Sequence, residues 1–248
     1  MSSIRILWDF DNSLISVNSD VWIPSKFSNK TSNDSKDNDF TRLIKAGKKA
    51  RVPWTALMAK VLVAMHGEDI SVEMIKAEAE QLPVDTNVLL AIRECAVMGA
   101  EQHIVSDANS FYIDAFLNKH HLTSLFTSVE TNPTSVSMTG CLCLEPAVPR
   151  DSPHNCHMCP PNLCKGAVLR AREWVKGEEG RTIYVGDGAG DECPARTLRK
   201  GDLVLARGGE EFPLAGILAE HPPIATVIVW NTFAELRNAL VTALKATS

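Results

Sequence analysis

The segment that decides the fold is IRILWDFDNS, residues 4–13. Residues 4–8 are a short, mostly apolar run, which predicts a buried strand. The run ends at Asp9 and Asp11, and side chains at i and i+2 of an extended chain share one face. Open α/β sheets bind ligands at the carboxyl ends of their strands, so this acid pair is a candidate site. An isolated Asp-x-Asp also fits a helix N-cap or a loop.

Further apolar runs predict the other strands of a parallel sheet. They cover residues 103–105, 182–185, 203–206 and 225–230. Segments with helical spacing cover residues 84–98, 111–120, 167–175 and 233–244. Thr232 and Glu235 are spaced as a capping box for the last of these helices. Alternating strands and helices predict an α/β fold, a doubly wound parallel sheet of the Rossmann type.

The first predicted strand ends at residue 8 and the second begins at residue 103, a longer gap than one crossover helix needs. We therefore expect an inserted helical cap domain at residues 21–95. The core would then consist of residues 1–20 and 96–248.

Within the insertion, helices are expected at residues 53–66 and 71–81. The polar run 28–39 has no apolar period, which predicts a mobile loop. Region 131–164 is rich in Pro, Cys and Ser and also lacks a period. We expect an ordered loop or a small hairpin there.

A second pair of acids follows the predicted strand that ends at Val185, in the sequence GDGAGD at residues 186–191. Glycines let the backbone approach a metal or a phosphate closely. The P-loop spacing is absent and the GxGxxG dinucleotide pattern is incomplete. Asp187 and Asp191 are therefore candidate metal ligands, and a glycine-rich turn whose acids serve solubility is the alternative.

Two more candidates lie between the acid pairs. Ser106 directly follows a predicted strand, and Lys165 directly precedes a predicted helix. A hydroxyl group and a cation at a helix start are suited to a phosphoryl group. Each residue alone also fits a helix cap or a solvated side chain. The order of acid pair, hydroxyl, lysine and acid pair is the informative feature.

These residues resemble the four motifs of the haloacid dehalogenase superfamily. More narrowly, the chain is similar to the phosphoethanolamine/phosphocholine phosphatase family, whose relatives include pyridoxal phosphate phosphatases and plant phosphatases of thiamine phosphate or pyrophosphate. The similarity is carried by WDFDNSLI (8–15), NSDVW (18–22), IVSDANSF (104–111), CPPNLCKG (159–166), YVGDGAGDECP (184–194) and LRKGD (198–202).

The resemblance implies a role for each candidate. Asp9 would attack phosphorus to form an aspartyl phosphate, and Asp11 would protonate the leaving alcohol and then activate water. Ser106 and Lys165 would bind the phosphoryl oxygens.

The resemblance also implies a magnesium ion. The ligands would be Asp9, the backbone carbonyl of Asp11 and Asp187, with Asp191 in support. Such an ion would lower the negative charge that a phosphoryl group meets at the nucleophile.

Two further acids, Asp20 and Asp107, match positions that face a cationic head group in this family; solvated loop residues are the alternative. The sequence departs from the superfamily at Ser13, where Thr is usual, and at residues 16–18, where acids are common. The hydroxyl is kept, so these departures affect the expected substrate more than the chemistry. The cap would close over the site and select the substrate.

The cysteines suggest a second metal. Cys141-x-Cys143 and Cys156-x-x-Cys159 resemble the ligands of a structural zinc ion, Zn²⁺. Buried thiols in a reducing compartment are the alternative.

Composition limits the partners. The chain has 25 Lys and Arg against 30 Asp and Glu, a net charge of -5, without a basic cluster for nucleic acid. No apolar run approaches the roughly 20 residues of a membrane helix. The start of the chain does not fit a signal peptide, so a cytoplasmic location is expected.

The sequence thus predicts a magnesium-dependent phosphatase of a small phosphorylated metabolite, similar to phosphoethanolamine or phosphocholine. Pyridoxal phosphate, thiamine phosphate and pyrophosphate stay open as substrates, because the shared motifs handle the phosphate and not the leaving group. A zinc-stabilised binding protein without turnover is an alternative of another class.

Overall fold

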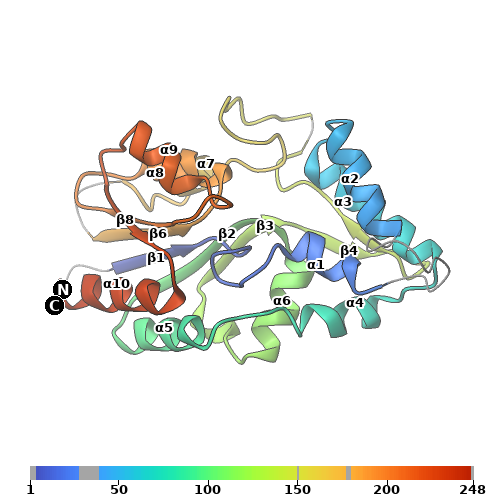
Figure 1. The fold of residues 1–248 in the computed structure, drawn as a ribbon, viewed down its shortest axis with the longest axis horizontal. Coiled ribbons are helices and arrows are strands. Elements are labelled where there is room, and N and C mark those ends of the chain that lie inside the picture. The colour runs from blue at the N-terminus through green and yellow to red at the C-terminus, as the bar shows by residue number, and fades with distance from the viewer. Residues whose placement is uncertain (1–3, 28–38, 150, 177–179, 247–248) are drawn as a thin grey trace.

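The computed structural model describes residues 4–27, 39–149, 151–176 and 180–246. Its centre is a six-stranded parallel sheet with the order β3-β2-β1-β6-β7-β8 (Figure 1). The strands are β1 (Ile4–Trp8), β2 (Glu101–Asn109), β3 (Ser128–Asn132), β6 (Arg181–Gly186), β7 (Leu203–Arg207) and β8 (Thr226–Trp230). The predicted α/β fold with a parallel sheet is confirmed. Strand β3 was not predicted, because it is a half-buried edge strand without an apolar run.

Helices cover both faces of the sheet (Figure 1). One face carries α5 (Thr86–Val97), α6 (Ser110–Lys119) and α10 (Phe233–Lys245), and the other carries α7 (Lys165–Ala171), α8 (Glu192–Thr197) and α9 (Leu214–Glu220). The side chains of β1 explain why helices cover both faces of the sheet. Ile6 and Trp8 belong to the apolar core on the first face and Leu7 to the core on the second.

The cap region contains α1 (Ser19–Ser25), α2 (Asp39–Lys49), α3 (Trp54–Gly67) and α4 (Val72–Ala79). These helices lie on the side to which β1 points (Figure 1). The two predicted cap helices correspond to α3 and α4. Helix α1 was missed because it is short and contains Pro24, and α2 because its sequence is mostly polar and charged.

Most of the predicted loop 28–39 lies outside the described residues; Asp39, which is described, begins α2 and was wrongly assigned to the loop. The domain boundary at residue 95 stays a prediction. Helix α5 spans that residue and packs against α10, where Arg237 forms an ion pair with Glu94. None of the helices in the described part of the chain is long and apolar enough to cross a membrane.

Region 131–164 contains the expected hairpin, formed by the antiparallel strands β4 (Thr134–Val136) and β5 (Leu142–Leu144). The described residues between β5 and Lys165, where α7 begins, form turns and bends. This helix is shorter than the predicted one because Glu173, with a φ of 57°, turns the chain soon after its end. Thr232 is the predicted N-cap of α10, since its side chain accepts from the Glu235 N–H, while the Glu235 carboxylate accepts from the Asn231 N–H next to the expected Thr232.

Candidate active site

Asp9 and Asp11 lie where β1 ends, at the centre of the sheet. The N–H of Asp9 donates to the Val185 carbonyl of β6 at 2.9 Å, so Asp9 keeps the place of a strand residue. The chain then turns sharply, with Asn12 at a φ of 55°. Asp11 faces the start of α1, where its Oδ1 accepts a hydrogen bond from the Ser19 N–H at 2.9 Å. The two carboxylates of the pair therefore have different partners.

The second acid pair is built around the Asp191 carboxylate. Its Oδ2 accepts from the backbone N–H groups of Asp187 and Gly188, both at 3.0 Å, and its Oδ1 accepts from the Tyr184 hydroxyl at 2.6 Å. A Cβ at Gly186 would lie 2.6 Å from Asp191 Cγ. Only glycine lets the loop close this tightly over the carboxylate.

Lys165 supplies the positive charge of the site. It is 3% exposed, and its Nζ lies 2.8 Å from Asp9 Oδ1 and 2.7 Å from Asp191 Oδ1. Burial by itself lowers the pKa of Lys165, but the charges of Asp191 and Asp9 outweigh it and raise the pKa well above its ordinary value. Lys165 is therefore charged at neutral pH and joins the two acid motifs.

Asp9, Asp187 and Asp191 each place a carboxylate oxygen within 4.8 Å of the other two. Burial, followed by the charge of Asp191, raises the pKa of Asp9 to about 6. Burial, followed by the charge of Asp9, raises the pKa of Asp187 to about 8. Asp9 Oδ1 is buried, and apart from its ion pair with Lys165 no group of the described residues is aligned to donate a hydrogen bond to it. Three crowded carboxylates fit a hard dication such as Mg²⁺.

These side chains surround one cavity of about 180 Å³. Among the predicted site residues, its wall contains Asp9, Asp11, Ser106, Asp107, Lys165, Asp187 and Asp191. Ser106 reaches it because Ile104 of β2 pairs with Trp8 of β1, which brings the next residues of both strands to the same edge. The structure thus gathers all the predicted phosphate and metal ligands at one place.

Asp20 lies outside this wall, on α1. Its Oδ2 accepts from Trp54 Nε1 at 2.8 Å. Burial raises the pKa of Asp20 to about 6; the Trp54 hydrogen bond opposes the rise and the charge of Asp107 adds to it. Asp107 lines the cavity and accepts from Asn162 Nδ2 at 2.9 Å. Asp20 and Asp107 are therefore close enough for their charges to interact.

Sequence reasoning missed three residues that shape the site. Trp54, the first residue of α3, lines the cavity and holds Asp20. Asn162 holds Asp107, and Tyr184 holds Asp191. Asn162 and Tyr184 lie within the segments CPPNLCKG and YVGDGAGDECP, which could have indicated them. Nothing in the spacing around Trp54 marks it, because its place depends on how the cap helices pack.

The structure does not bring together the two cysteine pairs that were predicted from spacing as zinc ligands. Cys141 and Cys143 belong to the β4–β5 hairpin, where their thiols donate to nearby backbone carbonyls. Cys156 and Cys159 instead approach Cys164 and a cysteine from α8, Cys193. Spacing could not show this, because Cys193 reaches the group only through the fold.

Comparison with known proteins identifies the family. The family model described as "Putative Phosphatase" matches residues 4–244. A thiamine phosphate phosphatase-like protein of Arabidopsis thaliana is 34% identical over 97% of this chain and 95% of the relative. Inorganic pyrophosphatase 2 of the same plant is 31% identical over 97% of this chain and 83% of the relative. A pyridoxal phosphate phosphatase of Mus musculus is 29% identical over 94% of this chain and 95% of the relative.

Solved structures share the fold. A phosphoserine phosphatase with an analogue of its phospho-aspartyl intermediate matches with a TM-score of 0.59 at 15% identity, over 96% of this chain and 99% of that chain. A haloacid dehalogenase family hydrolase from Salmonella enterica matches with a TM-score of 0.60 at 14% identity, over 95% of this chain and 70% of that chain. The chain therefore belongs to the "Putative Phosphatase" family and is a phosphatase, with the fold that haloacid dehalogenase hydrolases share.

Proposed function

We propose that this phosphatase hydrolyses a small phosphomonoester with a cationic head group, similar to phosphoethanolamine or phosphocholine. The carrying observation is the composition of one small cavity. Its wall joins the acids and Lys165 to Trp54 and Asp107, within about 180 Å³. The cavity is below the roughly 300–1,000 Å³ that is usual for drug-sized ligands. A compact substrate suits it, with phosphate toward Lys165 and a cation toward Trp54.

Asp9 is proposed as the nucleophile. One Asp9 carboxylate oxygen bonds to phosphorus while the bond from phosphorus to the leaving oxygen breaks. Asp11 donates its proton to that oxygen and later accepts a proton from the water that attacks the aspartyl phosphate. Burial, followed by the charge of Asp20, raises the pKa of Asp11 well above its ordinary value, which favours the protonated form that the first step needs.

Lys165 and Ser106 are proposed to hold the phosphoryl oxygens. Lys165 Nζ is already within 2.8 Å of Asp9 Oδ1, so an oxygen bound to the phosphorus that Asp9 attacks would lie within its reach. The Ser106 hydroxyl is buried at the edge of the same cavity, where it accepts from the Ala108 N–H at 3.2 Å and is free to donate its own proton.

Magnesium would be held by Asp9, Asp187 and the Asp11 backbone carbonyl, with Asp191 in support. When bound, the ion would supply positive charge to the phosphoryl oxygens and to the crowded carboxylates. Ser13 Oγ lies 3.4 Å from Asp187 Oδ1 and would help to orient that ligand.

The head group is assigned to the Trp54 side of the cavity. An ammonium group binds to the face of a tryptophan ring and to carboxylates. Asp107 lines the cavity and Asp20 holds the Trp54 ring by its Nε1 hydrogen. The two acids would thus act in different ways, with Asp107 near the cation and Asp20 orienting the tryptophan.

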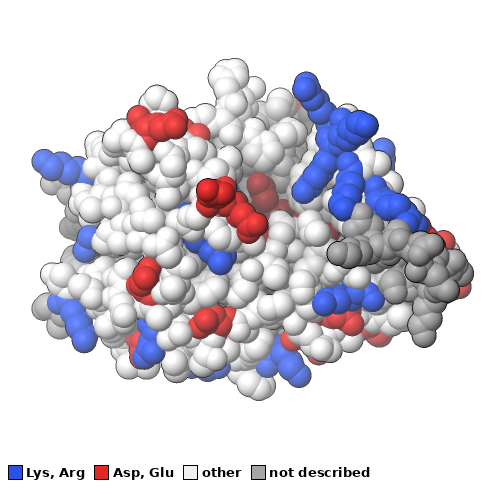
Figure 2. Space-filling view, viewed as in Figure 1, with Lys and Arg blue, Asp and Glu red and all other residues white. Residues whose placement is uncertain are grey.

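Pyrophosphate is a second candidate, because positive charge gathers beside Trp54. Figure 2 shows basic side chains over α2, at one side of the hollow in the surface. Arg42, Lys45, Lys48 and Lys49 of this helix are exposed. Lys48 Nζ lies 4.7 Å from the centre of the Trp54 ring. An anionic leaving group would interact favourably with Lys48, whereas an ammonium group would be repelled by it.

Pyridoxal phosphate and thiamine phosphate are favoured by a different feature. A mostly apolar cavity of about 380 Å³ lies between α3 and the loop before α7. Pro53, Ala56 and Asn162 line it, and Asn162 holds Asp107 of the first cavity. A ring-bearing leaving group could extend into this space.

A substrate panel tests these alternatives. Phosphate release would be measured on phosphoethanolamine, phosphocholine, pyridoxal phosphate, thiamine phosphate and pyrophosphate, with and without magnesium. We expect magnesium-dependent turnover that is greatest on the first two compounds and lost in Asp9→Asn. Highest kcat/KM on any of the other three would overturn the substrate assignment, and turnover that survives Asp9→Asn would overturn the nucleophile.

A substitution on α2 distinguishes the candidate substrates by the direction in which KM changes. Lys48→Ala should lower the KM for a cationic substrate, because it removes a repelling charge next to Trp54. The same change should raise the KM for pyrophosphate. Lys49→Ala is the matched control, since Lys49 is the next residue of the helix and also exposed.

A further inference from the structure

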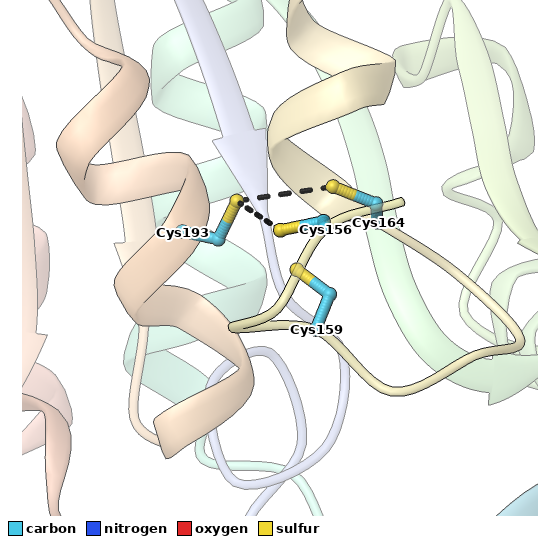
Figure 3. A group of neighbouring side chains, drawn as sticks. All are labelled: Cys156, Cys159, Cys164 and Cys193. Atoms are coloured by element: carbon cyan, nitrogen blue, oxygen red, sulfur yellow. Dashed lines mark hydrogen bonds between the residues drawn. The ribbon is translucent and has the colours of Figure 1, made fainter. Parts of the chain in front are cut away.

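Four cysteines from separate parts of the sequence meet beside the active site (Figure 3). Cys156 and Cys159 lie on the loop before α7, Cys164 is the residue that caps α7, and Cys193 lies in α8. The Sγ atoms of all four lie within 4.8 Å of one another. Cys156 Sγ and Cys164 Sγ are each 3.8 Å from Cys193 Sγ.

These separations match a tetrahedral metal site. With Zn–S bonds of about 2.3 Å, the four sulfurs of a tetrahedron lie about 3.8 Å apart. A disulfide would instead bring two sulfurs to about 2.05 Å. All seven cysteines are free thiols, so the group is arranged as separate sulfurs around a common centre.

We propose that Cys156, Cys159, Cys164 and Cys193 bind one thiophilic dication, Zn²⁺, as four thiolates. Thiolates select soft metals, and four of them leave no open position for water or substrate, as in structural zinc sites. Cys156 and Cys159 have the Cys-x-x-Cys spacing that such sites use. This site is separate from the three carboxylates and does not depend on the substrate that the enzyme accepts.

The loop between β5 and α7 shows what the ion would stabilise. In this stretch the described residues form turns and bends but no helix or strand. The loop is held by isolated hydrogen bonds, including His154 Nε2 to the Pro160 carbonyl at 2.8 Å and the Cys156 N–H to His154 Nδ1 at 3.1 Å. A metal site that forms only in the folded chain adds the free energy of metal binding to the free energy of folding. Bound zinc would therefore stabilise this irregular segment.

The ion would also join α7, which begins with Lys165, to α8, which begins directly after Asp191. Cys164 directly precedes Lys165, and its Sγ accepts from the Ala167 N–H at 3.3 Å. Cys193 follows two residues after Asp191, and a Cβ at Gly166 would lie 2.6 Å from its Sγ. The backbone at the start of α7 thus packs against the Cys193 thiol of α8. A metal bound by cysteines of both segments would fix the position of Lys165 relative to Asp191.

Metal analysis of protein purified without chelators tests the proposal. We expect one zinc per chain by mass spectrometry, and loss of that zinc in Cys156→Ser and Cys193→Ser. Cys143→Ser is the matched control and should retain the metal, because Cys143 belongs to the β4–β5 hairpin. Cobalt loaded in place of zinc should give intense thiolate-to-cobalt absorption in wild type and in the control alone.

The substitutions carry a risk of misfolding, so a second measurement uses the wild-type chain. A mercurial reagent that binds thiols reversibly should release zinc and lower the melting temperature. After an added small-molecule thiol has removed the reagent from the cysteines, added zinc should restore both, whereas magnesium should not. Wild-type protein without metal in the thiol group, iron in its place, or zinc retained in Cys193→Ser would each overturn the assignment.

Discussion

Two groups of possible metal ligands near Lys165 differ in donor type and in access to the cavity. One consists of the carboxylates of Asp9, Asp187 and Asp191, and the other of the thiols of Cys156, Cys159, Cys164 and Cys193. The carboxylates line an open cavity and leave Asp9 Oδ1 without an aligned donor among the described residues. The thiols face one another and leave no position free. Hard oxygen donors beside a cavity suit an ion that takes part in turnover, and a closed sulfur set suits an ion that holds the fold.

The two groups also differ in how their buried charge is balanced. Burial, together with the charges of the neighbouring acids, raises the pKa values of Asp9 and Asp187, and the charge of Lys165 opposes this rise only in part. A bound dication would complete the balance of charge among these carboxylates. The two metals should therefore be separable, since each group can be damaged without touching the other.

The largest expected effect is that of Asp9→Asn. It removes the proposed nucleophile, so kcat should fall by at least ~10⁴-fold, a loss typical of a nucleophile or its base. Phosphate release measures this. Zinc content should stay at the wild-type value, and its loss would show that the two groups are not independent.

Lys165→Met should have the next largest effect. It leaves Asp9 and Asp191 buried without their cation, and breaking a buried ion pair in this way costs about 3–5 kcal/mol. The free energy of unfolding would be measured by urea denaturation at about pH 7.5 in the presence of EDTA. Exposed Lys49→Met is the control and should stay within about 0.5 kcal/mol of wild type. A similarly small change for Lys165→Met would contradict the charge balance described above.

Asp20→Asn tests an acid that belongs to neither group, and its effect on stability should depend on pH. A raised pKa in the folded state means that this acid contributes stability below its ordinary pKa and loses it as pH rises through about 6. The loss is of the order of 1–3 kcal/mol. Asparagine keeps an oxygen for the Trp54 Nε1 hydrogen, so the variant should lose less stability than wild type between pH 4 and 7.

The measurement is the melting temperature across that range, in wild type, Asp20→Asn and the exposed control Asp69→Asn. The control should follow wild type. Equal slopes in all three proteins would remove Asp20 as the source of the dependence.

Fold and site were not equally predictable from the sequence. Asp9, Asp11, Lys165, Asp187 and Asp191 could be predicted because each lies just after a strand or at the start of a helix, and parallel strands bring such ends to one edge. Ser106 was expected to follow its strand, but it lies within β2, which continues to Asn109. It reaches the same edge because the pairing of β1 with β2 ends at Trp8 and Ile104. Trp54 could not be predicted, because its position is set by how α3 packs on the core. Cys193 could not be paired with Cys156 for the same reason: the packing of α7 on α8 joins them, and no spacing along the chain records it.

The most direct test of the central assignment is mass spectrometry of the protein quenched in acid during turnover of phosphoethanolamine with magnesium. We expect one phosphoryl group on the peptide that contains Asp9, absent in Asp9→Asn and absent when substrate is omitted. Phosphate release without any phosphorylated Asp9, or an adduct on another residue, would contradict Asp9 as the group that carries the phosphoryl.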